Sequence, residues 1–189
     1  MPPAQDPTSL LQEWSGGNSV AMNELVQVLY QQMHRIAAAQ LQGERSLTLQ
    51  PTQLVNEVYL RLVQIREMEW RDRNHFLAMF ARIARRALVD EARRRRAGKR
   101  AGQAVTLSTQ IPLPTVAQVD VLQIDALLER LATIDSVAAR VVEMRVFSGL
   151  TLEDVATQLE LSISTVSRKW RAAKAWLAEE MRTDLPDGA

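Results

Sequence analysis

Along most of the chain, hydrophobic residues recur every three or four positions, a spacing that gives an α-helix one apolar face. No convincing alternation typical of strands is found. The spacing therefore predicts an all-α fold, with helices over residues 9–14, 19–42, 51–65, 75–95, 119–132, 136–147, 152–159 and 163–181.

One long interruption divides this helical pattern. Residues 99–117 read KRAGQAVTLSTQIPLPTVA, and no helical spacing continues through them. We therefore predict two small helical domains, residues 1–100 and 119–182, joined by a flexible linker over residues 101–118. Residues 183–189, TDLPDGA, are predicted to form a disordered tail.

The stretch from Thr151 to Leu177 has the pattern of a helix-turn-helix. Thr151 is a good N-cap with Asp154 three residues on, Glu160 and Leu161 form the turn, and Ser162 caps the second helix. The exposed face of that second helix suits a DNA major groove, because it carries hydroxyls and cations: Ser164, Thr165, Ser167, Arg168, Arg171 and Lys174. The alternative is an ordinary helical hairpin on the protein surface.

Charge is distributed unevenly, although the net charge is only +1. Residues 82–100 contain nine basic and two acidic residues, a local charge of +7, whereas residues 101–189 contain eight basic and twelve acidic residues. A ridge of cations along one helix can follow a phosphate backbone. The predicted DNA-binding residues of this ridge are Arg82, Arg85, Arg86 and Arg93. The alternative is a solvated helix end.

Residues for catalysis or metal binding are scarce. The chain has no cysteine, and its two histidines, His34 and His75, lie in different predicted helices with no metal-binding motif around them. No phosphate-binding glycine loop occurs. We therefore expect no enzymatic activity, cofactor or metal. No apolar run is long enough to span a bilayer and MPPAQDP lacks signal-peptide features, so we expect a soluble cytoplasmic protein without a membrane partner.

Two stretches resemble a known family. LVNEVYLRL followed by FLAMFARIARRALVDEARRRR is similar to the second conserved domain of bacterial sigma factors of the extracytoplasmic-function (ECF) group, a class of sigma-70. AARVVEMRVFSGLTLEDVATQLELSISTVSRKWRAAKAWL resembles their fourth domain. The resemblance implies a subunit that binds core RNA polymerase through the β′ clamp helices and the β flap. It also implies recognition of the −35 promoter element by the C-terminal hairpin, and recognition and opening of the −10 element by the N-terminal domain.

The resemblance also implies roles for individual residues. Ser164, Thr165, Arg168 and Arg171 fall on the −35-reading helix, whereas Arg85, Arg86, Asp90 and Arg93 fall on the helix that meets the −10 element. The loop over residues 67–74 is where such proteins hold an extruded base, which makes Trp70, Arg71 and Asn74 weaker candidates. For Trp70 we favour packing in the core. The polymerase-docking helix carries Leu54 and Val55, and the core-binding candidates Gln50, Gln53, Asn56 and Glu57.

The chain departs from its family just before this docking helix. Gln50-Pro51-Thr52-Gln53 stands where the family has an acidic motif that meets basic residues on β′. We hypothesise that a Ser/Thr kinase phosphorylates Thr52 (Thr48 is the less favoured candidate), because a phosphate adds about −1.5 to −2 charges. The alternative is that Thr52 is a neutral residue of the first turn and that other contacts compensate.

The function expected from the sequence is therefore promoter-specific transcription initiation. An anti-sigma protein is a further candidate partner. Two other interpretations remain: a helix-turn-helix regulator of transcription that acts without joining RNA polymerase, and a helical protein-interaction module whose charges serve solvation.

Overall fold

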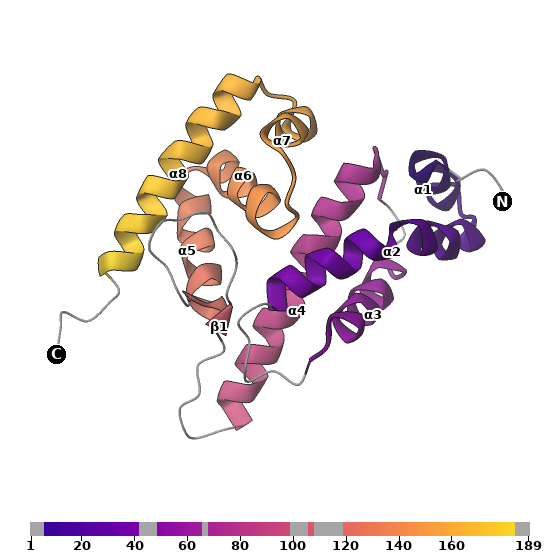
Figure 1. The fold of residues 1–189 in the computed structure, drawn as a ribbon, viewed down its shortest axis with the longest axis horizontal. Helices are drawn as coiled ribbons and strands as arrows, with labels where there is room; N and C mark the ends of the chain where they lie inside the picture. Colours follow the sequence, from indigo (N-terminus) through magenta and orange to yellow (C-terminus); the bar gives the residue numbers. More distant parts are fainter. Residues whose placement is uncertain (1–5, 42–48, 66–67, 99–105, 108–118, 184–189) are drawn as a thin grey trace.

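The computed structural model describes residues 6–41, 49–65, 68–98, 106–107 and 119–183. Within them the chain is almost wholly helical, so the predicted all-α class is confirmed (Figure 1). Two strands of two residues each, β1 (Thr106–Leu107) and β2 (Val119–Asp120), add a small antiparallel pair that the sequence pattern did not predict. Of the predicted linker only residues 106–107 are described, and they form β1. Thr183, predicted to begin a disordered tail, is the last residue of helix α8 (Ile163–Thr183), and the rest of the tail lies outside the described residues.

The first four helices pack into an N-terminal unit. They are α1 (Pro7–Ser15), α2 (Ser19–Leu41), α3 (Pro51–Leu62) and α4 (Arg73–Gly98). Helices α2 and α3 lie against each other and against α4, and the apolar stripes expected from the sequence meet between them. The largest fully buried side chains there include Leu29, Met33, Leu54, Phe76 and Phe80. Burial of these stripes is the main favourable contribution to folding of the unit.

Trp70 belongs to this core, as favoured from the sequence. Its side chain is only 5% exposed. The ring stacks on Trp14 with the two centroids 5.2 Å apart, and Phe76 meets it edge-on at 5.4 Å. The segment before α4 is therefore fastened to α1 by an aromatic cluster.

The last four helices form a C-terminal unit. They are α5 (Val121–Ile134), α6 (Ser136–Phe147), α7 (Leu152–Leu159) and α8 (Ile163–Thr183). Helix α8 crosses α6 and α7, and its buried residues Val166, Trp170 and Leu177 point into this unit. The helix-turn-helix predicted over residues 151–177 is thus present as α7 and the first part of α8.

Capping residues set the ends of the hairpin helices. The backbone N–H of Asp154 donates to the Thr151 hydroxyl at 3.0 Å, and the Thr151 N–H donates to the Asp154 carboxylate at 3.0 Å. Glu160 ends α7 in the left-handed conformation with φ of 56°. The Ser162 hydroxyl then accepts from the Thr165 N–H at 3.2 Å. The N-caps predicted at Thr151 and Ser162 are confirmed.

Thr151→Ala is expected to destabilise the protein by about 1 kcal/mol, because it removes the acceptor for an N-terminal N–H of α7. Urea unfolding followed by circular dichroism measures the loss. Thr157→Ala is the matched control, since Thr157 is an exposed threonine within the same helix, and its effect should stay within about 0.5 kcal/mol. Equal losses in the two variants would contradict a capping role.

Several helix ends differ from those expected: α1 begins at Pro7, α4 ends at Gly98, α5 spans Val121–Ile134 and α8 ends at Thr183. Two further differences have a local cause. Helix α4 begins at Arg73 rather than His75, because the Asp72 carboxylate accepts from the His75 N–H at 2.8 Å and so caps the helix. Helix α3 ends at Leu62 rather than near Ile65. There the Ile65 N–H donates to the Leu62 carbonyl at 3.0 Å, which tightens the last turn. Local hydrogen bonding accounts for both differences.

The two units lie against each other in this structure (Figure 1). Helix α4 contacts α5, α6 and α7, and α2 contacts α6. The buried Gln40 side chain of α2 donates to the Phe147 carbonyl of α6 at 3.2 Å and to the Ala81 carbonyl of α4 at 3.1 Å. We call the boundary between the two units the seam.

Candidate nucleic-acid interface

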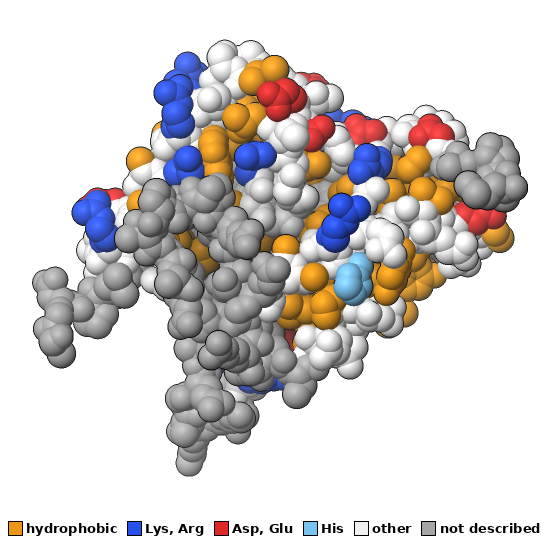
Figure 2. Space-filling view, viewed as in Figure 1, with side chains coloured by type: hydrophobic (Ala, Val, Ile, Leu, Met, Phe, Trp, Pro, Cys, Tyr) orange, Lys and Arg blue, Asp and Glu red, His pale blue; other side chains and the backbone are white. Residues whose placement is uncertain are grey.

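The predicted recognition helix presents its polar face to solvent. Ser164, Arg168 and Arg171 are exposed, and Thr165 and Ser167 are half-buried between them. Cationic side chains lie along the α8 edge of the C-terminal unit (Figure 2). The five residues proposed for reading DNA therefore share one accessible face of one helix, held by the buried Val166 and Trp170 behind it.

The basic ridge of α4 is divided between solvent and the seam. Arg82, Arg86 and Arg93 are exposed, as expected, but Arg85 is only 7% exposed. Its guanidinium forms ion pairs with Asp125 of α5 and with Glu143 of α6, the latter at 2.5 Å, and lies 5.5 Å from the centre of the Phe147 ring. Arg93 also reaches Asp125, at 3.2 Å. The expectation of one open cationic face thus fails at Arg85 in this arrangement.

The segment before and at the start of α4 is also engaged by the C-terminal unit. Arg71 pairs with Glu160 at 2.9 Å, and Asn74 donates to Asp154 at 2.9 Å. The Gln158 amide donates to both oxygens of the Asp72 carboxylate at 2.8 Å. Residues 71–74 therefore do not form an open loop in this structure, since helix α7 and its C-terminal turn contact them.

These partners were missed by sequence reasoning. Asp125 and Glu143 stand at ordinary helical positions, and no local motif marks them. The signal that could have found them is the charge balance, because the acidic excess of residues 101–189 faces a segment with a local charge of +7.

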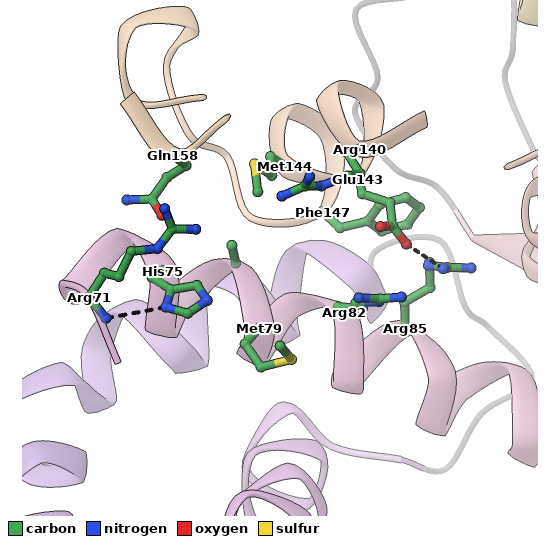
Figure 3. A pocket seen from close by; sticks show the side chains of 11 residues that line it. Arg71, His75, Met79, Arg82, Arg85, Arg140, Glu143, Met144, Phe147 and Gln158 are labelled. Carbon is green, nitrogen blue, oxygen red and sulfur yellow. Dashed lines mark hydrogen bonds and ion pairs between the residues drawn. The ribbon is translucent and has the colours of Figure 1, made fainter. Parts of the chain in front are cut away.

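A cavity of about 170 Å³ opens between the units beside these contacts (Figure 3). Four arginines line its wall together with apolar side chains, with Arg71, Arg82 and Arg85 on one side and Arg140 on the other. Burial lowers the pKa of His75 in this wall, and the nearby charges of Arg71 and Arg140 lower it further, against an opposing effect of Asp72. The neutral form of His75 is therefore favoured here.

The depressed pKa of His75 predicts a loss of stability on acidification. Above pH 6.5, the ordinary pKa of a histidine, His75 is mostly neutral in both the folded and the unfolded chain, so its lowered pKa has little effect on stability. Below that value the unfolded chain takes up the proton more readily, so stability falls as pH drops toward the folded-state pKa. The test compares the free energy of unfolding of the wild type with that of His75→Gln between about pH 7.5 and 5. The wild-type free energy of unfolding minus that of His75→Gln should fall as the pH is lowered. A difference that stays constant with pH would contradict the prediction.

The part of the chain that the structure describes contains neither a metal-binding cluster nor a membrane-spanning helix. No group of three or more His, Cys, Asp or Glu side chains there could hold a metal ion. None of the helices in the described ranges is long and apolar enough to cross a bilayer.

Comparison with known proteins decides the family. The sequence matches the ECF sigma factor family over residues 4–183, which is nearly the whole chain. The chain belongs to the ECF sigma factor family. No curated protein and no solved structure matched it. Sigma factors of this family act in transcription initiation as subunits of RNA polymerase, so core polymerase and promoter DNA are the partners of the chain.

Helix α3, which the family resemblance predicts to dock on core polymerase, presents an open polar face to solvent. Gln50, Thr52, Gln53, Asn56 and Glu57 are all exposed. The first turn of α3 contains no acidic residue, and the Gln53 amide instead accepts from the Gln50 N–H at 2.8 Å. In that turn a glutamine thus fulfils the capping role that an acidic side chain would otherwise have.

Around Thr52 the surface is polar and uncrowded. Its hydroxyl lies 3.5 Å from the Tyr30 hydroxyl. On the next turn, Glu57 pairs with Arg61 at 3.0 Å, and Arg61 also reaches Asp90 of α4 at 3.3 Å. The Glu57 carboxylate, on the face predicted to dock on core polymerase, is therefore already partly neutralised.

Proposed function

We propose that this sigma factor directs core RNA polymerase to its promoters through α8 and the basic ridge of α4, and that phosphorylation of Thr52 activates binding to core. The observation that carries the proposal is an exposed threonine in the first turn of a docking helix that has no acidic residue there. A Ser/Thr kinase is the partner this requires. An anti-sigma protein remains a candidate partner, and we infer a cytoplasmic role without catalysis by the chain itself.

Electrostatics supports Thr52 as the switch. A phosphate there would stand at the positive end of the α3 dipole, where negative charge is stabilised. Thr52 and Asn56 are four residues apart, so they lie on one face of the helix. The added charge would therefore project from the face assigned to core binding. Charge complementarity at such a surface sets both the association rate and the register of the complex.

Thr52→Glu is expected to raise the affinity for core RNA polymerase about tenfold, because it restores one carboxylate to the docking face. Core binding is measured with purified core enzyme, and transcription is measured in the same mixtures. Unmodified wild type and Thr52→Ala should both bind weakly, whereas wild type phosphorylated by a kinase should exceed Thr52→Glu, since a phosphate carries more charge.

Ser9→Glu is the matched control, because it adds one carboxylate to the first turn of α1 at another exposed position. It should leave core binding unchanged. Equal core affinity of unmodified wild type and Thr52→Glu would overturn the proposed switch. DNA binding by a chain that never associates with core, in any of these forms, would favour the regulator that acts without polymerase.

A further inference from the structure

A set of charged and polar contacts crosses the seam, in addition to the apolar packing that places both units in one core cluster. Each of these contacts joins a promoter-binding candidate of the N-terminal unit, or a direct neighbour of one, to an acidic or amide side chain of the C-terminal unit. Figure 3 shows one of them, Arg85 with Glu143. The pairs are Arg85–Asp125, Arg85–Glu143, Arg93–Asp125, Arg71–Glu160, Asp72–Gln158 and Asn74–Asp154. The contacts extend from Arg71, in the segment before α4, to Arg93 in the sixth turn of that helix.

The carboxylates of Asp125 and Glu143 bind the Arg85 guanidinium, which a DNA phosphate would otherwise have to bind. Both terminal nitrogens of Arg85 are engaged, one by Asp125 and one by Glu143, and the residue is buried. A guanidinium whose two terminal nitrogens donate to carboxylates cannot at the same time bind a phosphate through the same pair of nitrogens. The closed arrangement and DNA binding through Arg85 therefore exclude each other.

Beside this apolar packing, the seam has polar features that are typical of a reversible contact. Three buried polar atoms beside it have no hydrogen-bond partner: the Gln40 Oε1, the Arg85 Nε and the Gln158 Oε1. Unpaired buried polar groups are unfavourable, and polar inter-domain surfaces resemble those of transient complexes. Separation of the units would return these atoms to water.

Closure leaves the other two functional surfaces open. Thr52 and the docking face of α3 are exposed, and so are Arg168 and Arg171 on α8. The seam thus buries Arg85 of the −10-reading surface and leaves Arg86 and Arg93 exposed. The proposed phosphorylation site stays accessible to a kinase.

We propose that the acidic side chains of the C-terminal unit, chiefly Asp125 and Glu143, form an intramolecular docking surface that occupies the −10-reading face of the N-terminal unit. In this closed form the sigma factor is unable to engage the −10 element. Promoter recognition requires that the units separate and release Arg85. The inference rests on the proposed function, because it takes α4 and residues 71–74 as promoter-contacting.

The first test opens the seam. Asp125→Asn combined with Glu143→Gln removes both carboxylates from Arg85, and X-ray scattering then measures the radius of gyration. A compact chain of this length has a radius of gyration of about 16 Å, and the variant should be measurably larger than the wild type. Its affinity for a labelled duplex of random sequence should rise at least about fivefold, since Arg85 becomes free for phosphate.

Removal of two carboxylates raises DNA affinity by charge alone, so a matched control is needed. Glu153→Gln with Glu179→Gln removes two exposed carboxylates from the same unit, at positions without a partner across the seam among the described residues. An equal gain in DNA affinity in this control, or an unchanged radius of gyration in the Asp125→Asn/Glu143→Gln variant, would overturn the inference.

The second test closes the seam covalently. The chain has no cysteine, so in Arg71→Cys/Glu160→Cys a short thiol-specific crosslinker can join only these two positions. In a Thr52→Glu background, the crosslinked protein should still bind core polymerase but lose at least about 90% of the transcription given by the same protein before crosslinking. Undiminished transcription after crosslinking would overturn the inference.

The two proposals fail in different ways. If Thr52→Glu never binds core, the proposed switch fails, but the scattering and duplex measurements still report on the seam because they contain no polymerase. If core binding succeeds and crosslinking has no effect on transcription, the seam inference fails alone.

Discussion

Replacement of both Arg168 and Arg171 by alanine is expected to abolish recognition of the −35 element while leaving the fold intact. Both side chains are exposed on α8. The one hydrogen bond of the Arg171 side chain within the described residues is to the Ser167 carbonyl one turn earlier, at 3.5 Å. A specific arginine–base contact contributes about 1–3 kcal/mol of discrimination. The double variant should therefore lose about 2–6 kcal/mol of specific binding if both arginines read bases.

Selection of promoters from randomised DNA measures this effect. Core polymerase with the Thr52→Glu protein should enrich a conserved −35 sequence, and the same enzyme with Arg168→Ala/Arg171→Ala should not. Arg182→Ala is the matched control, because Arg182 is an exposed arginine near the end of the same helix and pairs with Glu179. Loss of the −35 sequence in the control as well would indicate a general effect of charge rather than base reading.

Replacement of Trp70 by alanine is expected to destabilise the N-terminal unit by about 3–5 kcal/mol, the range for truncation of a large buried aromatic side chain. The residue is 5% exposed and contacts Trp14 and Phe76. Its loss leaves a cavity between α1 and α4 that rigid helices cannot close fully. Urea unfolding measures the change in free energy.

Trp176→Ala provides the comparison, since Trp176 is half-buried on α8 and lies under the guanidinium of Arg130. Its loss should cost clearly less than that of Trp70. If Trp70 instead served to stack an extruded base, Trp70→Ala would leave stability nearly unchanged and impair promoter opening. The two measurements therefore separate the two roles considered for this residue.

Most of the local structure followed from the sequence. The repeat of apolar positions gave the helices, and the residues at their ends gave the caps: Thr151 and Ser162 cap where their side chains predicted. The predicted core position of Trp70 was also confirmed. These features depend on residues close together in the chain, and sequence patterns report such relations directly.

The helix ends and the short strand pair were predicted less well from the sequence. The short strand pair β1–β2 joins residues about a dozen positions apart, and two residues per strand give no alternating pattern to detect. The start of α4 depended on Asp72, whose side chain competes with solvent for the first N–H groups of the helix. Such ends are set by single hydrogen bonds, and the spacing of hydrophobic residues gives no information about these bonds.

The sequence by itself determined which helices form, which face of each is apolar, and that two helical units of opposite charge balance occupy the chain. Only the tertiary structure decided what covers the basic ridge. Arg85 meets Asp125 and Glu143 across 40 and 58 residues of chain, and Arg71 meets Glu160 across 89. Helical periodicity fixes the direction of a side chain relative to its own axis, but it carries no information about which distant element lies opposite. That choice depends on how the two units pack and on the charges that they bring together.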